Sequence, residues 1–236
     1  GAGDITLVDD IVTVSGQVLL TADDRISFGS TATITSTSGN VTLQADDDDA
    51  AGDNDDILMV DGSVIDAGSG TISLDTNKAG GSNGGSITVG RLVTTNTSAT
   101  SIVLDSLTSV VDGGDTGGAD IASGGRLVIT SRTGVGSAGA IETAVASLDV
   151  TNATSGNIDI AEADDIQIVK ATQTTAGDIQ VVTTDGGITV SDGLAGDNVV
   201  VSLVGSGQLT LTAQETTLGA GDITLVDDIV TVSGQV

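Results

Sequence analysis

The chain has 236 residues and a formal net charge of −27, from 33 acidic and 6 basic residues, and it contains no Trp, Tyr, Cys, His or Pro. This charge excludes nucleic acid and anionic membrane surfaces as expected partners, and the lack of cysteine excludes disulfides and thiolate metal sites. The hydrophobic content of 38%, mostly Val, Ile and Leu in short runs, argues against disorder, and no run is long enough to insert into a membrane.

One short pattern recurs along the chain: glycine, any residue, aliphatic, polar or small, aliphatic. In chain order it occupies residues 3–7, 39–43, 70–74, 85–89, 125–129, 156–160, 177–181 and 207–211, and it starts again at 221. A period of two predicts short strands with one buried face, and the leading glycine allows the backbone to turn a corner. Asp, a turn residue, supplies 30 of the 33 acids, so the sequence predicts an all-β fold without helices.

The spacing of these strands favours a parallel β-solenoid. Most intervals lie near 15, 20 or 30 residues, which suits irregular coils of roughly 20–30 residues with two or three strands each. The missing proline agrees with ladders in which every N–H donates to the neighbouring coil. We therefore expect an elongated, right-handed solenoid with an Ile/Val/Leu/Ala core and polar Thr/Ser/Asp faces. A β-sandwich is the alternative all-β arrangement.

Four Gly/Asp/Ser-rich segments interrupt the pattern and are expected to protrude as loops. They are Asp46–Asp56, Asn77–Gly85, Asp112–Ala122 and Ser131–Ala140.

The first of these loops is the candidate metal site. Its aspartates, whose oxygens suit a hard cation such as Ca²⁺, are Asp46, Asp47, Asp48, Asp49, Asp53, Asp55 and Asp56. The spacing does not match the helix-loop-helix calcium motif, and Asp112–Ile121 does not match the nonapeptide calcium repeat. A solvated acidic loop that binds no defined ion is the alternative for both segments. No other cofactor is expected.

Three adjacent carboxylate pairs could in principle serve acid–base chemistry on polysaccharides. They are Asp9-Asp10, Asp23-Asp24 and Asp164-Asp165. Adjacent residues of a strand point to opposite faces, and Asp-Asp is also a common turn sequence. Because the chain has neither His nor the aromatic platforms of sugar-cleaving solenoids, we do not expect an enzyme.

The first eighteen residues, Gly1–Val18, return without change as Gly219–Val236. Residues 1–218 thus form one unit with a charge of −24, and residues 219–236 begin an identical second unit. Eight or so coils per unit would rise by about 40 Å. Because Gly219 begins another glycine-led strand, Ile223 and Leu225 should stack in the line that passes through Ile5 and Leu7.

The glycine-led strands, together with segments 156–163 (GNIDIAEA) and 140–150 (AIETAVASLDV), resemble the β-helical shaft of filamentous haemagglutinin-type exoproteins. These proteins belong to the giant repetitive adhesins of bacterial surfaces. The resemblance spans nearly the whole chain. It implies secretion across an outer membrane, folding outside the cell, and a shaft without catalytic or binding residues at defined positions.

The expected function is a structural extracellular fibre or surface filament. Its partners would be further copies of the unit, end to end, with lateral bundling as a second mode of association. The shaft of a calcium-dependent adhesin is the main alternative, and a polysaccharide-active β-helix enzyme is a further one.

Overall fold

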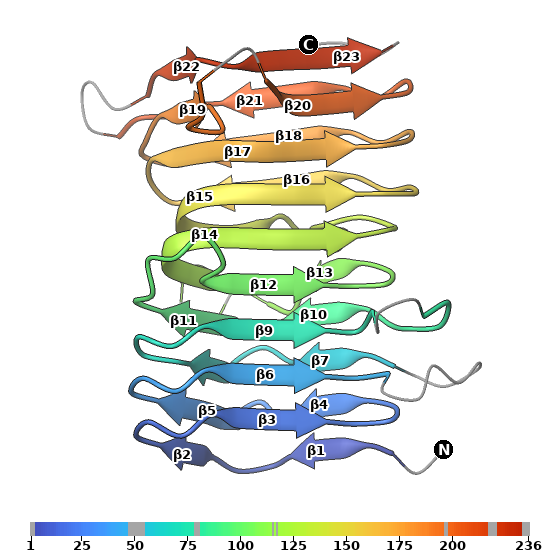
Figure 1. The fold of residues 1–236 in the computed structure, drawn as a ribbon, viewed down its shortest axis with the longest axis vertical. Coiled ribbons are helices and arrows are strands. Elements are labelled where there is room, and N and C mark those ends of the chain that lie inside the picture. Colours follow the sequence, from blue (N-terminus) through green and yellow to red (C-terminus); the bar gives the residue numbers. More distant parts are fainter. Residues whose placement is uncertain are drawn as a thin grey trace.

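The computed structural model describes residues 3–46, 55–77, 81–114, 116, 118–195, 198–216 and 221–232. Within this part of the chain all regular elements are β-strands, and every hydrogen-bonded pair of strands is parallel. Figure 1 shows the strands stacked in layers, from β1 to β3 at the bottom to β21 to β23 at the top. The predicted all-β class is confirmed, with long parallel sheets in place of the two antiparallel layers of a sandwich.

One line of paired residues, here called ladder A, runs through the whole stack. It contains β1 (Ile5–Leu7), β4 (Ile26–Phe28), β7 (Ile57–Met59), β10 (Ile87–Val89), β13 (Val110–Asp112), a bridge at Val135, β16 (Ile158–Glu162), β18 (Ile179–Thr183) and β21 (Leu209–Thr212). Ile5 pairs with Ile26, and Ile26 pairs in turn with Ile57. We call one passage of the chain from a ladder A strand to the next a rung, and its length agrees with the coil length predicted from the strand spacing.

Two further ladders complete each rung. Ladder B contains β2 (Ile11–Thr13), β5 (Thr33–Ser36), β8 (Val64–Asp66), β11 (Arg91–Thr94) and the first parts of β14 (Ile121–Ser131) and β15 (Ile141–Asn152). Ladder C contains β3 (Val18–Thr21), β6 (Val41–Gln44), β9 (Ile72–Asp75), β12 (Ile102–Asp105), the second parts of β14 and β15, β17 (Ile166–Gln173), β19 (Ile188–Val190), β20 (Val199–Val204), β22 (Ile223–Leu225) and β23 (Asp228–Val232). The lower rungs therefore use three short strands, whereas β14 and β15 run on from ladder B into ladder C.

The core is the column of inward side chains between these ladders. Ile26, Ile57 and Ile87, consecutive on ladder A, are fully buried, and the only Phe, Phe28, pairs with the only Met, Met59. Burying one such side chain contributes roughly 1.5–3 kcal/mol. The predicted aliphatic core is confirmed for the lower rungs.

Glycines allow neighbouring rungs to approach closely at one corner. A Cβ on Gly39 would lie 2.0 Å from the carbonyl oxygen of Gly16 in the rung below, and a Cβ on Gly70 would lie 2.3 Å from that of Gly39. No side chain fits at such distances. Gly39 and Gly70 are thus required by the rung beneath them as well as by the turn.

Two of the four predicted loops differ from expectation. Segment Ser131–Ala140 contains Val135, which is fully buried and bridges Val110 below and Ile158 above, so it belongs to the core. In segment Asp112–Ala122, the backbone N and the hydroxyl of Thr116 donate hydrogen bonds of 3.1 and 2.7 Å to Asp61, which holds that residue against an earlier rung.

The second copy of the opening sequence does not continue the line of the first. Ladder A leads from Ile5 to Leu209 in β21, whereas β22, the copy of β1, pairs with β19 on ladder C. The prediction that Ile223 and Leu225 stack above Ile5 and Leu7 is therefore wrong. The physical reason is that ladder A reaches Leu209 fourteen residues before Ile223, so the unit is not a whole number of rungs.

Candidate functional site

The aspartates of the predicted calcium loop lie largely outside the described residues. Asp47, Asp48, Asp49 and Asp53 are not described, whereas Asp46, Asp55 and Asp56 are. Asp46 and Asp55 are buried at the two ends of the loop, and Asp56 accepts hydrogen bonds of 2.7 and 2.8 Å from the backbone N and the hydroxyl of Ser86. The Asp56 carboxylate thus joins its rung to the next through these two hydrogen bonds.

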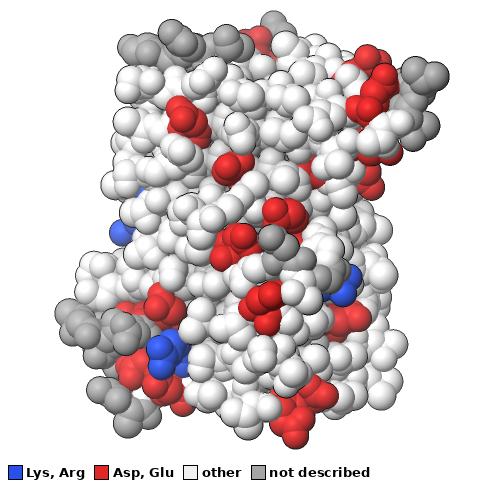
Figure 2. Space-filling model, turned by 180° about the vertical axis from the view of Figure 1, so that it is seen from behind, with Lys and Arg blue, Asp and Glu red and all other residues white. Residues whose placement is uncertain are grey.

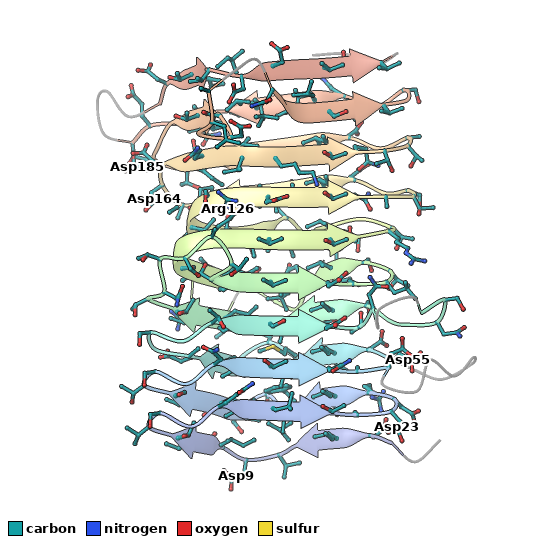
Figure 3. The ribbon with its side chains drawn as sticks, in the orientation of Figure 1. Asp9, Asp23, Asp55, Arg126, Asp164 and Asp185 are labelled. Carbon is teal, nitrogen blue, oxygen red and sulfur yellow. The ribbon has the colours of Figure 1, made fainter. Side chains whose placement is uncertain are left out.

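The three aspartate pairs do not converge. Figure 3 places Asp9 at the lower end of the stack, Asp23 at one side and Asp164 at the opposite side near the top. Within the described residues the only ion pair joins Arg25 to Asp4 at 3.8 Å, and both side chains are at least a third exposed. Such a surface pair adds little to stability.

A different group of carboxylates does converge, from three separate elements. Asp112 ends β13, Asp120 precedes β14, and Glu142 is the second residue of β15. One carboxylate oxygen from each lies within 4.8 Å of the other two, and no other group of three His, Cys, Asp or Glu within ligand distance occurs in the described chain. We call these three residues the acidic cluster.

Backbone groups fix the cluster in place. The N–H of Glu142 donates a 3.2 Å hydrogen bond to Oδ2 of Asp120, and the N–H of Gly114 donates a 2.6 Å bond to Oδ1 of Asp112. Asp120 is only 2% exposed. Oε2 of Glu142 is buried and accepts no hydrogen bond from an N–H or hydroxyl group in the part of the chain that the structure describes.

Burial and like charges favour the protonated form of Asp120 in this cluster. Burial, above all, raises the pKa of Asp120 from 3.8 to about 8, and a side-chain hydrogen bond with Glu142 and the charges of Glu142 and Asp112 add to this effect. Carboxylates this close cannot all ionise unless a cation lies between them. The arrangement can therefore hold either a shared proton or a hard, oxygen-binding cation.

Sequence reasoning missed the third member of the cluster. Asp112 and Asp120 lie in a segment considered for calcium, but Glu142 comes from the following rung. The sequence contains only a weak indication of its role, namely that Glu142 is one of only three glutamates in a chain rich in Asp. Helix-favouring Glu is unusual among the turn-forming aspartates of this chain.

Figure 2 shows acidic side chains spread over the whole height of the face opposite to that of Figure 1, with few basic ones. This face of the molecule is thus generally anionic. No helix among the described residues has the length and apolarity that a membrane crossing requires.

A second glutamate, Glu162, points into the core. It ends β16, which runs on from ladder A into ladder B, and it stands there above Ile121 and Thr143, fully buried. The Thr143 hydroxyl donates a 2.7 Å hydrogen bond to Oε2, and the N–H groups of Val145 and Ala163 donate bonds of 3.2 and 3.0 Å to Oε1. Desolvation raises its pKa from 4.5 to about 7, and the hydrogen bonds from Thr143 and from the N–H groups of Asp164 and Val145 act in the opposite direction. The predicted purely aliphatic core is wrong at this level of the stack.

We predict that Glu162 makes stability depend on pH. A carboxyl with a folded-state pKa above its unfolded value binds its proton more tightly in the native state, so stability is highest at low pH. The contribution is lost as the pH rises from about 4.5 to about 7, at a cost of about 3 kcal/mol when the full shift is expressed. Urea unfolding followed by circular dichroism at pH 5 and pH 8 should show a smaller difference for Glu162→Gln than for the unmodified chain. Glu215→Gln, at an exposed glutamate, is the control, and an equal difference in all three proteins would contradict the assignment.

A polar network also crosses the corner between ladders C and A. Asn152 and Gln173, both fully buried, lie one above the other on β15 and β17. Nδ2 of Asn152 donates to Oε1 of Gln173 at 3.0 Å and to the carbonyl of Ser155 at 2.8 Å, while its Oδ1 accepts from the N–H of Gly134 at 3.1 Å. These amides satisfy backbone groups that an aliphatic side chain would leave unpaired.

No protein-family model matches this sequence, and neither the search of curated proteins nor that of solved structures found a match.

Proposed function

We propose that this chain is a segment of a structural, extracellular fibre built as a right-handed parallel β-solenoid. One observation carries the proposal: the second copy of the opening sequence is stacked as part of the ninth rung, with β22 on β19 and β23 on β20. Within the described residues, ladder pairing thus joins strands of the second unit to strands of the first. Right-handedness follows the strong preference of parallel crossover connections.

The upper end of the stack supports the same proposal. Side chains that would belong to a core line an open hollow there of about 380 Å³, among them Leu209, Leu211, Ile223, Leu225 and Ile229. Ile223 and Leu225 are 44% and 58% exposed although their strand pairs with β19. A further rung of the same kind would cover this apolar surface and use the free edges of β21 to β23.

In this proposal, the acidic surface protects the fibres from associating with one another. A charge of −24 per unit opposes edge-to-edge pairing between fibres and keeps them apart at low salt. The scattered positions of Asp9, Asp23 and Asp164, which lie at the lower end and on opposite sides of the stack, favour this mechanical role over polysaccharide cleavage (Figure 3).

The proposal is tested by varying the number of units. Chains with one, two and three copies of residues 1–218, each followed by residues 219–236, should form rods of constant width that lengthen by about 40 Å per unit in electron micrographs. Beads of fixed size joined by flexible links would contradict a continuous solenoid. Surface exposure in the source cell is tested by labelling intact cells with an antibody.

The shaft of a calcium-dependent adhesin is the second candidate, because the acidic cluster offers three oxygens to one cation. We predict that millimolar Ca²⁺ raises the melting temperature and that chelator reverses the increase. Glu142→Gln should abolish this shift, whereas Asp149→Asn, which removes one charge from the same strand, should retain it. Equal calcium responses in the two variants would assign the effect to general screening of the charge, and no response in the unmodified chain would rule out this candidate.

A further inference from the structure

The chain carries the same twelve residues in two places that the structure describes, 3–14 and 221–232. In the first copy Ile5–Leu7 forms β1 on ladder A and Ile11–Thr13 forms β2 on ladder B. In the second copy both corresponding strands, β22 and β23, lie on ladder C at the top of Figure 1. One sequence thus occupies two different faces of the stack.

The pairing register defines the displacement residue by residue. Leu225, the copy of Leu7, is in line with Val18 of β3 through Val190, Ile168, Leu148, Leu127, Ile102, Ile72 and Val41. Ile229, the copy of Ile11, is in line with Leu20 through Val201, Ala171, Val150, Ile129, Leu104, Leu74 and Leu43. The first strand of the copy has moved from ladder A to ladder C, and the second has moved from ladder B to ladder C.

The change of face alters the surroundings of identical side chains. Val12 is 74% exposed on β2, whereas its copy Val230 is 37% exposed on β23. Asp9 lies exposed at the lower end of the stack, but its copy Asp227 is buried and accepts a 2.8 Å hydrogen bond from the N–H of Asp192. The strands tolerate both placements because their alternation, and not the identity of the face, decides which side chains turn inward.

We infer that consecutive units of the fibre are rotated about its axis, by between one and two of the three strand positions in a rung. This inference rests on the proposed fibre. It means that equivalent strands of successive units wind around the fibre instead of lying in one straight line. The true axial period would then be two or three units, on the order of 80–120 Å, with about 40 Å as the rise per unit. Equivalent surfaces of successive units would then point in different directions around the fibre axis, so neighbouring fibres on different sides would meet similar surfaces.

Cross-linking within the 236-residue chain tests the rotation, and the absence of natural cysteine makes each introduced pair unique. Thr224 pairs with Thr189 in the rotated placement, whereas a second copy in phase with the first would stand above Thr210 on ladder A. With a short thiol cross-linker, T189C/T224C should react at least tenfold faster than T210C/T224C. T6C/S27C is the matched control, because Thr6 is the first-copy equivalent of Thr224 and its hydroxyl lies 3.2 Å from that of Ser27.

The possible results separate this inference from the fibre itself. Faster reaction of T210C/T224C would overturn the rotation and leave the continuous fibre intact. Failure of both pairs, with the control pair reacting and circular dichroism unchanged, would mean that the second copy does not stack, which overturns the fibre as well. In chains of several units, gold particles bound to one introduced cysteine per unit should appear on changing sides of the rod, and a single straight row would contradict the rotation.

Discussion

Replacing Gly39 by alanine is expected to destabilise the stack by about 3 kcal/mol or more, because the new methyl group would overlap backbone atoms of the rung below. Its carbon would lie 2.0 Å from the carbonyl oxygen and 2.6 Å from the carbonyl carbon of Gly16. Neither atom belongs to a side chain that could rotate away. Relief would require two rungs to separate, which would break ladder hydrogen bonds on both sides of the corner.

Gly29→Ala is the matched control for this prediction. A Cβ at Gly29 would lie 3.6 Å from the nearest atom, the carbonyl oxygen of Leu7, which is an ordinary contact. We expect a change of less than about 1 kcal/mol, since alanine also reduces the entropy of the unfolded chain. Chemical unfolding followed by circular dichroism measures both variants, and similar losses in the two would show that the corner does not need glycine for close approach.

Replacing Asn152 by alanine is expected to cost about 4 kcal/mol or more, because several buried groups lose a partner together. Its amide joins Gln173 above, Ser131 and Gly134 below, and the carbonyl groups of Ser155 and Gly156. Asn152→Leu fills the volume and still leaves them unpaired, so it should be nearly as damaging as the alanine variant.

The exposed Asn157 is the control for Asn152. Its Oδ1 accepts one hydrogen bond, of 2.9 Å, from the N–H of Asp178. Asn157→Ala should cost about 1 kcal/mol. Unfolding measurements on the three variants decide between lost hydrogen bonds and lost packing, because recovery of stability in Asn152→Leu would attribute the effect to the cavity alone.

The regular part of the fold could be predicted from the sequence because local alternation encodes it. The patterns of segments such as Gly39–Leu43 and Gly70–Leu74 predict their strands directly, and the corner glycines lie where neighbouring rungs approach each other. Val135 escaped prediction because Gly134 and Gly136, both with positive φ, interrupt the alternation around it. One buried residue between two glycines does not produce an alternation of apolar and polar residues that the sequence could show.

The acidic cluster and the buried polar side chains were not predicted from the sequence, and the reason differs from that for Val135. Glu162 and Asn152 end their strands two residues after the buried Ile160 and Val150, so the alternation places them inward, but a polar residue at a strand end also suits the start of a turn. The cluster depends on which residue of one rung stands over which residue of the next. A single chain without a known register does not contain this information in any local pattern.

The spacing of partners along ladder A has a consequence for how the chain can fold. Partners such as Ile5 and Ile26, or Ile26 and Ile57, are separated by a single rung of chain. Each rung can therefore form by pairing with the rung that precedes it in the sequence. A chain released gradually from its N-terminal side could add each rung to the finished end of the stack, much as a crystal grows by layers. Its assembly time would then increase in proportion to its length, and a very long array could be built without a correspondingly long search.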